Sequence, residues 1–501
     1  MSVRNLTVAL LFSLSLFSTQ ALAQQQPSGG SGGGGVLGLL PADAMTDHVL
    51  DAGGEAIAYK ATAGTLNLFG QDGNRTGEVF YTAYVAKNGG SDRPVTFVFN
   101  GGPGASSAYL NLGLVGPRVL DFGPNGRDGA KAKLIDNPDS WLQFTDLVLI
   151  DPIGTGWSRT VKPDDASDFY GVRADAESLA KVIALYVSHN GRASSPKYLL
   201  GESYGGLRSA KVASALRQQQ GILVSGIVMV SPLIEGRLVY GGEGSALSAA
   251  LQLPSLAAAA LERRNGFSEA ALTEAEKFAT GDYLTTLVGR PPSGEAGRAF
   301  YARVAALTGV PVDVVARSNG FLQDVYVKHS VDDGSEVVSS YDASLVVPDP
   351  YPESHADKGD DPILDGFTRA YGGAFSSYAR DELGFHTDMT YTLLSEAVNG
   401  HWDWGGGRGG GSRFEASGTD DIRQMLSLVP SFHLLIAQGY SDLVIPYGIN
   451  KYIIEHLPPE ASGRVGLKLY HGGHMFYTRP PSRAQFAADA KAFFAAPLRS
   501  E

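Results

Sequence analysis

Residues 197–216 read KYLLGESYGGLRSAKVASAL, and this stretch decides the fold that we expect. The apolar run at 198–201 predicts a short buried strand, and the apolar residues from Leu207 onward recur at helical spacing. Between them, GESYG at 201–205 fits a GxSxG pattern, whose flanking glycines permit a cramped turn. A strand, a tight turn and a helix in this order would expose the Ser203 hydroxyl as a nucleophile. A plain glycine turn is the alternative.

Further short apolar runs predict a mostly parallel sheet. They lie at residues 95–100, 147–151, 227–230, 432–437 and 465–470. Residues 173–189 place their apolar side chains on one helical face, and the β-branched and aromatic run at 77–87 predicts an early antiparallel strand. Strands that alternate with helices indicate the α/β class, with helices on both faces of the sheet.

The composition changes between residues 236 and 428. An alanine- and leucine-rich helix is expected at 244–264, and a glycine-rich stretch follows at 401–412. A capped closing helix is expected at 482–496, with Phe486, Phe493 and Phe494 facing inward. We therefore expect two parts of one core, at 37–235 and 429–501, separated by a mainly helical insertion or cap at 236–428.

The first residues predict export. A short apolar run and the small-x-small pattern Ala21-Leu22-Ala23 are typical of a signal peptide at 1–23. A buried or anchoring helix is the alternative. Residues 24–36, rich in glycine, serine and glutamine, are expected to form a disordered tether. The expected location is periplasmic or extracellular.

Composition narrows the classes of partner and chemistry. The chain has no cysteine, which excludes thiol catalysis and disulfides. Asp and Glu number 52 against 40 Lys and Arg, for a formal charge of −12, and no basic cluster predicts nucleic-acid binding. No further run predicts a membrane span, and the sequence leaves the oligomeric state open.

Two candidates could activate Ser203. A serine hydroxyl needs a positioned base, and in this fold an acid and then a histidine follow the serine along the chain. His474 lies after the strand expected at 465–470, and Asp442 is the sole carboxylate in the turn after the strand at 432–437. A structural histidine, a zinc pair from His471 and His474, and a helix-capping Asp442 are the alternatives.

A glycine-rich loop could stabilise a developing oxyanion. Residues 99–107 read FNGGPGASS and begin where the strand at 95–100 ends. The Gly102 N–H, together with the N–H of Tyr204, would form the pair of donors. The lysine of a phosphate-binding loop is absent, so a nucleotide site is disfavoured, and a turn without catalytic duty is the alternative.

These motifs together resemble the serine carboxypeptidase family, which has the α/β-hydrolase fold. The resemblance rests on NGGPGASS at 100–107, DPIGTGWS at 151–158, GESYGG at 201–206, Asp442, and GHM at 473–475. It covers most of residues 90–235 and 430–480, and it does not extend by motif to the insertion. It implies a hydrolase that needs no metal or cofactor and acts on peptide substrates.

The resemblance also implies a site for the substrate's terminal carboxylate. Asn100, the Gly101 N–H and a protonated Glu202 would hold it, because two ionised carboxylates repel. The family's second glutamate, a partner to Glu202, is here Leu114, and a usual cysteine is Ala105. Without that partner, we expect Glu202 to ionise at lower pH and carboxylate recognition to be weakened or rebuilt from the insertion.

Three functions follow in order of support. The first is a carboxypeptidase that removes C-terminal residues through an acyl-enzyme on Ser203. The second is an esterase or acyl hydrolase that uses the same residues. The presence of Leu114 in place of the family's second glutamate motivates it. The third is a non-catalytic binding protein on a hydrolase scaffold, against which the complete set of candidate groups argues.

Overall fold

The computed structural model describes residues 35–123, 128–241, 244–331, 334–354, 358–405 and 411–495. The signal peptide expected at 1–23, most of the tether expected at 24–36, and residues 406–410 of the glycine-rich stretch lie outside these ranges. Within them, no helix combines the length and the apolar character that crossing a bilayer requires.

A ten-stranded sheet forms the centre of the described chain, in the order β1-β2-β3-β7-β4-β9-β10-β13-β14, with β8 paired to β3. Its strands are β1 (Ala44–Ala52), β2 (Glu55–Phe69), β3 (Arg75–Ala86), β4 (Val95–Phe99), β7 (Asp146–Ile150), β8 (Arg159–Thr160), β9 (Lys197–Glu202), β10 (Gly226–Val230), β13 (His433–Gly439) and β14 (Val465–Tyr470). Strands β7, β4, β9, β10, β13 and β14 run parallel, and β1 to β3 form an antiparallel edge.

The strands expected from the apolar runs are all present, with bounds that agree within two residues. The α/β class and the antiparallel strand expected at 77–87 are also confirmed. Strands β1 and β2 were not anticipated. Only part of each faces the core, and β1 alternates exposed and half-buried residues over most of its length.

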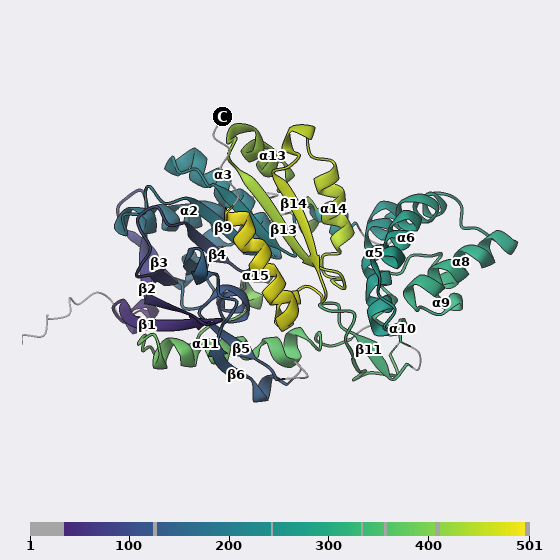
Figure 1. Ribbon diagram of the computed structural model, residues 1–501, viewed down its shortest axis with the longest axis horizontal. Helices are drawn as coiled ribbons and strands as arrows, with labels where there is room; N and C mark the ends of the chain where they lie inside the picture. The colour runs from purple at the N-terminus through teal and green to yellow at the C-terminus, as the bar shows by residue number, and fades with distance from the viewer. Residues whose placement is uncertain are drawn as a thin grey trace, which may run out of the picture. The chain divides into compact units, whose positions relative to one another are not determined.

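Helices cover both faces of the sheet (Figure 1). Because side chains alternate along a strand, Phe97 and Phe99 of β4 pack with one group of helices and Val98 packs with the other. The first group contains α2 (Val172–His189), α3 (Tyr204–Ala215), α13 (Thr419–Leu428) and α14 (Tyr447–Glu455). The second contains α11 (Ala370–Asp381) and α15 (Pro480–Ala495).

The closing helix α15 differs from its predicted form in one detail. It begins at Pro480, so Ser482 is not its N-cap, and the Ser482 hydroxyl instead donates to the backbone oxygen of His471 at 2.7 Å. Phe486 is fully buried, and Phe493 and Phe494 are half-buried against the same core. The inward-facing aromatic residues were therefore predicted correctly.

The segment between residues 236 and 428 divides into two groups of elements. One group has its own apolar core and gathers to the right in Figure 1: α5 (Ala246–Arg263), α6 (Glu269–Phe278), α7 (Leu284–Val288), α8 (Gly294–Thr308), α9 (Val312–Arg317), α10 (Tyr326–His329), β11 (Glu336–Val338) and β12 (Val346–Pro348). Helices α11 and α13 pack instead on the sheet's own cores. Two short helices also belong to this segment: α4 (Gly236–Val239) precedes α5, and α12 (Glu396–Gly400) lies between α11 and α13 in the sequence.

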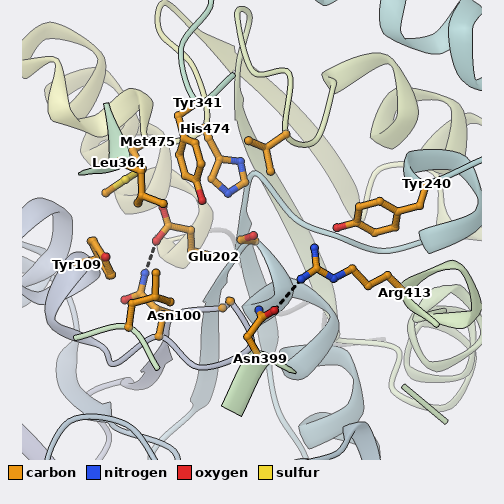
Figure 2. A pocket seen from close by; sticks show the side chains of 16 residues that line it. Asn100, Tyr109, Glu202, Tyr240, Tyr341, Leu364, Asn399, Arg413, His474 and Met475 are labelled. Atoms are coloured by element: carbon orange, nitrogen blue, oxygen red, sulfur yellow. Dashed lines mark hydrogen bonds between the residues drawn. The ribbon is translucent and has the colours of Figure 1, made fainter. Parts of the chain in front are cut away.

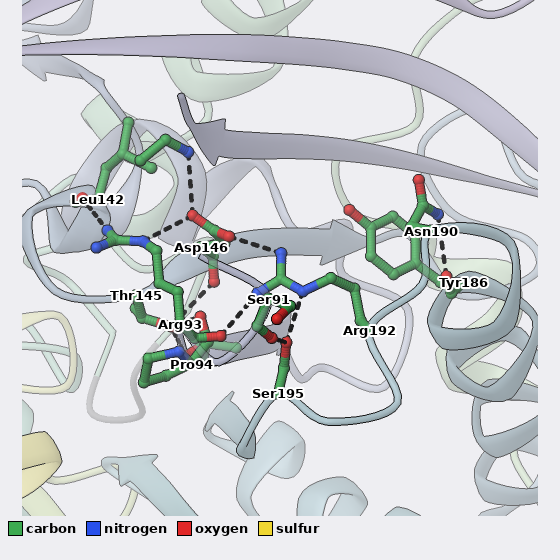
Figure 3. A network of polar contacts seen from close by, with 12 residues as sticks. Ser91, Arg93, Pro94, Leu142, Thr145, Asp146, Tyr186, Asn190, Arg192 and Ser195 are labelled. Atoms are coloured by element: carbon green, nitrogen blue, oxygen red, sulfur yellow. Dashed lines mark hydrogen bonds and ion pairs between the residues drawn. The ribbon is translucent and has the colours of Figure 1, made fainter. Parts of the chain in front are cut away.

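A buried ionic network fixes the starts of the central strands (Figure 3). Asp146, the first residue of β7, accepts from Arg93 Nε at 2.9 Å and from Arg192 Nη1 at 2.6 Å. Arg192 also donates to Ser195 Oγ at 2.7 Å, just before β9. Because these polar contacts link the residues at the starts of β4, β7 and β9, the opposite ends of the three strands are held in register.

Candidate active site

The predicted site residues meet at the carboxyl ends of the parallel strands. Asn100 follows β4, Ser203 follows β9, Asp442 lies beyond β13, and His474 lies beyond β14. In a parallel sheet these ends lie along one edge, where ligands bind. Asn100, Ser203 and His474 line one cavity of about 220 Å³, together with Gly101, Gly102 and Glu202 (Figure 2).

The Ser203 backbone has the conformation that the sequence pattern predicted. Its φ of 59° and ψ of −126° lie in a region that L-residues rarely occupy, a strain of about 1–3 kcal/mol. The Ser203 N–H donates to the Val230 oxygen at 2.9 Å, which holds the turn against β10. A Cβ atom added to Gly201 would lie 1.9 Å from the Gly205 oxygen, so the turn requires glycine there.

His474 and Asp442 form a buried pair. His474 Nδ1 lies 2.9 Å from Asp442 Oδ2, and because a carboxylate only accepts, Nδ1 carries the hydrogen. Asp442 Oδ1 accepts from the Ile445 N–H at 2.9 Å, so the carboxylate also holds its own turn. Burial alone would lower the pKa of His474, but the charge of Asp442, its hydrogen bond and the charge of Glu202 together raise the pKa.

His471 takes no part in this cavity. Its Nδ1 lies 2.8 Å from Glu262 Oε1, and the imidazole is more than half exposed. Among the described residues, no group of three or more potential ligands is placed to hold a metal ion. The zinc pair considered from the sequence therefore has no further ligand in that part of the chain.

The glycine loop contacts the turn that carries Ser203. A Cβ atom on Gly101 would lie 2.6 Å from the Tyr204 nitrogen, and Gly102 has a φ of 100°. Among the described residues, the amides of Gly102 and Tyr204 donate to no backbone or side-chain acceptor. Two unpaired N–H groups therefore belong to adjoining segments, as an oxyanion site requires.

Glu202 is fully enclosed beside Ser203. Its Oε1 accepts from the Tyr477 hydroxyl at 2.7 Å, and its Oε2 accepts from Asn100 Nδ2 (Figure 2). The Leu110 N–H donates to Asn100 Oδ1 at 3.1 Å, which fixes the orientation of that amide. Burial raises the pKa of the Glu202 carboxyl to about 7, although the charge of His474 and both hydrogen bonds lower it.

The pKa of Glu202 is raised above its ordinary value even though Leu114 stands in place of a second glutamate. Burial is the main cause, since removing a carboxylate from water disfavours its charged form. Tyr477 is the partner that the sequence did not reveal. A Cβ atom on Gly113, next to Leu114, would lie 2.7 Å from the Tyr477 ring, so Tyr477 occupies this region. The position of Tyr477, three residues after His474, is the sequence feature that could have identified it as a residue of the site.

Residues between 236 and 428 supply six of the side chains that line the cavity, which the motifs did not predict. These residues are Tyr240, Tyr341, Leu364, Leu394, Asn399 and Arg413. The two tryptophans of the 401–412 stretch pack against Tyr204, the residue after Ser203, and do not line the cavity. Trp402 and Trp404 are buried, with ring centroids 5.3 and 5.5 Å from the Tyr204 ring.

Comparisons with known proteins identify a family with a similar sequence. Residues 56–237 match the model of the family described as serine carboxypeptidase. The chain is related to the serine carboxypeptidases. The pheromone-processing carboxypeptidase KEX1 of Yarrowia lipolytica is 30% identical over 162 residues, which cover 32% of this chain and 25% of that protein. Serine carboxypeptidase-like 35 of Arabidopsis thaliana is 31% identical over 152 residues, 30% of each chain.

A structural comparison extends the fold resemblance to most of the chain. The crystal structure of a prohormone-processing carboxypeptidase, Kex1, from Saccharomyces cerevisiae has a TM-score of 0.54. The superposition covers 87% of this chain and 91% of that structure, at 16% sequence identity. The α/β-hydrolase fold of the serine carboxypeptidases is thereby confirmed. The sequence matches span about a quarter to a third of the relatives' length.

Proposed function

We propose that this chain is a serine carboxypeptidase that removes C-terminal residues from peptides. The observation that carries the proposal is the Glu202 carboxyl, buried beside Ser203 and held by Asn100 and Tyr477 with a pKa of about 7. A carboxyl that is neutral in mildly acidic solution donates a hydrogen bond to a substrate carboxylate instead of repelling it. Such a group suits a substrate with a free terminal carboxylate.

In the proposed reaction, Ser203 attacks the carbonyl of the last peptide bond. His474 Nε2 takes the serine proton, because Nδ1 is bound to Asp442, and later gives the proton to the leaving amine. The amides of Gly102 and Tyr204 donate to the oxyanion of the tetrahedral intermediate. Water then releases the shortened peptide from the acyl-enzyme on Ser203.

In the bound complex, the Gly101 N–H, Asn100 and the protonated Glu202 hold the terminal carboxylate. Protonation of Glu202 also removes one of the negative charges that raise the pKa of His474. His474 is therefore more easily kept neutral, as a general base must be, when Glu202 is in its binding form. Protonation of Glu202 favours a pH below about 7, whereas a neutral His474 favours a higher pH, so activity is expected where the two conditions overlap, near neutral pH.

An esterase or acyl hydrolase with the same Ser203, His474 and Asp442 is the second candidate. Leu114 in place of the second glutamate favours it, and the Tyr477–Glu202 hydrogen bond argues against it. A non-catalytic binding protein is the third, and covalent labelling of Ser203 by a fluorophosphonate would exclude it.

A matched pair of substrates separates the first two candidates. We expect a blocked dipeptide with a free C-terminal acid to be cleaved at least about 100-fold faster, in kcat/KM, than its C-terminal amide. Equal rates, with faster hydrolysis of aryl esters, would establish the esterase and remove the carboxypeptidase. The comparison is best made at pH 5.5 and pH 8, because Glu202 changes its charge between them.

The proposal includes the organisation and location of the chain. Residues 1–23 would be a signal peptide and 24–36 a tether, so that the enzyme acts in the periplasm or outside the cell. The cores at 37–235 and 429–501 would carry the catalytic groups, and the insertion at 236–428 would act as a cap. Six residues of the cavity wall that come from the insertion support the last assignment.

A further inference from the structure

The cavity has two chemically different ends (Figure 2). Glu202, Asn100 and Tyr109 lie at one end, and apolar side chains of Leu364 and Met475 lie near them. Arg413 and Tyr240 lie at the other end. His474 stands between the two, so a bound peptide that crosses the reacting groups extends from one end to the other.

Arg413 is tied to the catalytic loop by a chain of hydrogen bonds. Its Nη2 donates to Asn399 Oδ1 at 2.7 Å (Figure 2). Asn399 Nδ2 donates to the Pro103 oxygen at 3.0 Å, and Pro103 directly follows Gly102 in the glycine loop. Because the Asn399 amide is engaged on both sides, it fixes the guanidinium relative to the oxyanion donors.

Packing holds Arg413 in the same position. A Cβ atom on Gly236 would lie 1.8 Å from the Arg413 oxygen, so the backbones of α4 and of the short helix η9 (Arg413–Glu415) are in direct contact. The guanidinium carbon lies 5.8 Å from the Trp404 ring centroid and 5.9 Å from that of Tyr240. Two aromatic faces thus support the cation at the cavity wall.

The charge of Arg413 is not neutralised by a carboxylate among the described residues. The nearby acid Glu235 is engaged with Ser417 at 2.6 Å and with Arg237 at 3.5 Å. Among the described residues, Arg413 therefore offers a cation without a carboxylate partner to whatever fills this end of the cavity.

We propose that Arg413 selects peptides with an acidic residue before the last one. The inference rests on the proposed carboxypeptidase function. If the terminal carboxylate is held at the Glu202 end and the scissile carbonyl lies at Ser203, the penultimate residue lies on the far side of the reacting groups. Its side chain then points toward the Arg413 end. A glutamate there forms a hydrogen bond in which both donor and acceptor are charged, in place of one with a neutral acceptor.

The test compares two substrates on the full-length enzyme. The substrates are blocked dipeptides, Glu–Phe and Gln–Phe, which differ only in the charge of the penultimate side chain. We expect the wild-type enzyme to favour the glutamate peptide about tenfold in kcat/KM at low salt, and less at high salt because Arg413 is exposed. In Arg413→Gln this ratio should fall to about one, because the glutamate peptide loses much more in kcat/KM than the glutamine peptide does. Arg413→Lys should keep part of the preference.

Arg423→Gln is the matched control, because it removes the same charge from an exposed position on α13 outside the cavity. It should leave the ratio unchanged. A ratio near one in the wild type, or a ratio that survives Arg413→Gln, would overturn the inference. Equal slowing of both peptides by Arg413→Gln would also overturn it, since the guanidinium would then bind the terminal carboxylate. If neither peptide loses its last residue, the proposed function falls as well.

Discussion

The hydroxyl of Tyr477 lies 2.7 Å from Oε1 of Glu202, and it donates one of the two hydrogen bonds that hold this buried carboxyl. Leu114, where related sequences would be expected to carry a second glutamate, is itself fully buried. The chain thus replaces a second ionisable group with a phenol whose pKa burial raises far above neutrality. Glu202 can consequently titrate without sharing its proton with another carboxyl.

Tyr477→Phe should shift the pH dependence of substrate binding. The Tyr477 hydrogen bond lowers the pKa of Glu202, so its loss should raise that pKa further above its ordinary value. KM for a free-acid peptide should then begin to rise at a higher pH than in the wild type. The variant should also lose about 1 kcal/mol of stability. Tyr351→Phe, at an exposed tyrosine outside the cavity, is the control, and an unshifted KM profile would contradict the role given to Tyr477.

Glu202→Gln should remove the alkaline rise in KM. In the wild type, Glu202 loses its proton as the pH passes about 7, and the resulting carboxylate repels the terminal carboxylate of the substrate. A glutamine is neutral at every pH, so KM for the free acid should stay level between pH 5 and 9. The C-terminal amide should show no such rise with either enzyme. A rise in KM that persists in the variant would show that another group is responsible.

The same substitution should alter how stability depends on pH. A carboxyl whose pKa is raised from 4.5 in the unfolded chain to about 7 holds more protons when folded, so stability falls as the pH rises through this window. The wild type should lose up to about 3 kcal/mol more than Glu202→Gln between pH 4.5 and 8. Denaturant unfolding at several pH values measures the difference, and parallel curves would contradict the raised pKa.

Ser203→Gly and Ser203→Ala should both be inactive but should differ in stability. The φ of 59° and ψ of −126° at Ser203 strain any residue that has a Cβ atom, and glycine relieves this strain. We expect Ser203→Gly to be more stable than Ser203→Ala by about 1–3 kcal/mol. Equal unfolding free energies for the two variants would show that the turn is not strained.

Gly101→Ala should disrupt the reaction through geometry alone. The added Cβ atom would lie 2.6 Å from both the backbone oxygen of Glu202 and the backbone nitrogen of Tyr204. This clash would force the glycine loop away from the Ser203 turn. A loss of about 100-fold or more in kcat is expected, comparable to the loss of an oxyanion donor. Gly90→Ala, where the added atom meets open space, should retain full activity. Near-normal kcat in Gly101→Ala would exclude close contact between these two segments.

Local pattern was sufficient to predict the parallel part of the sheet and the residues at its carboxyl ends. The strands that carry Asn100, Ser203 and Asp442 are short, apolar and buried on both faces, and the strand before His474 is half-buried and apolar except at Lys468. The order of the motifs along the chain then placed their side chains at one edge of the sheet. The antiparallel strand β1 lacked this signal, because one of its faces meets solvent.

Contacts between distant segments could not be predicted from the pattern. Arg413 reaches the cavity because its backbone packs on Gly236 and because Asn399 links it to Pro103. No pattern of residue spacing in the sequence predicts these contacts. The raised pKa of Glu202 is a property of its burial and was likewise inaccessible from the residue types around it. The position of Arg413 at the cavity therefore became visible only in the tertiary structure, whereas the sequence motifs identified Ser203, Asp442 and His474 as candidates.

Release of a C-terminal amino acid from a free-acid peptide, followed for the wild type and for Ser203→Ala, tests the proposed reaction most directly. The wild type should release one residue from the carboxyl end. Ser203→Ala should be slower by roughly 10⁴-fold or more, with an unchanged circular dichroism spectrum. A folded Ser203→Ala protein that releases the residue at the wild-type rate would contradict the assignment of Ser203 as the nucleophile.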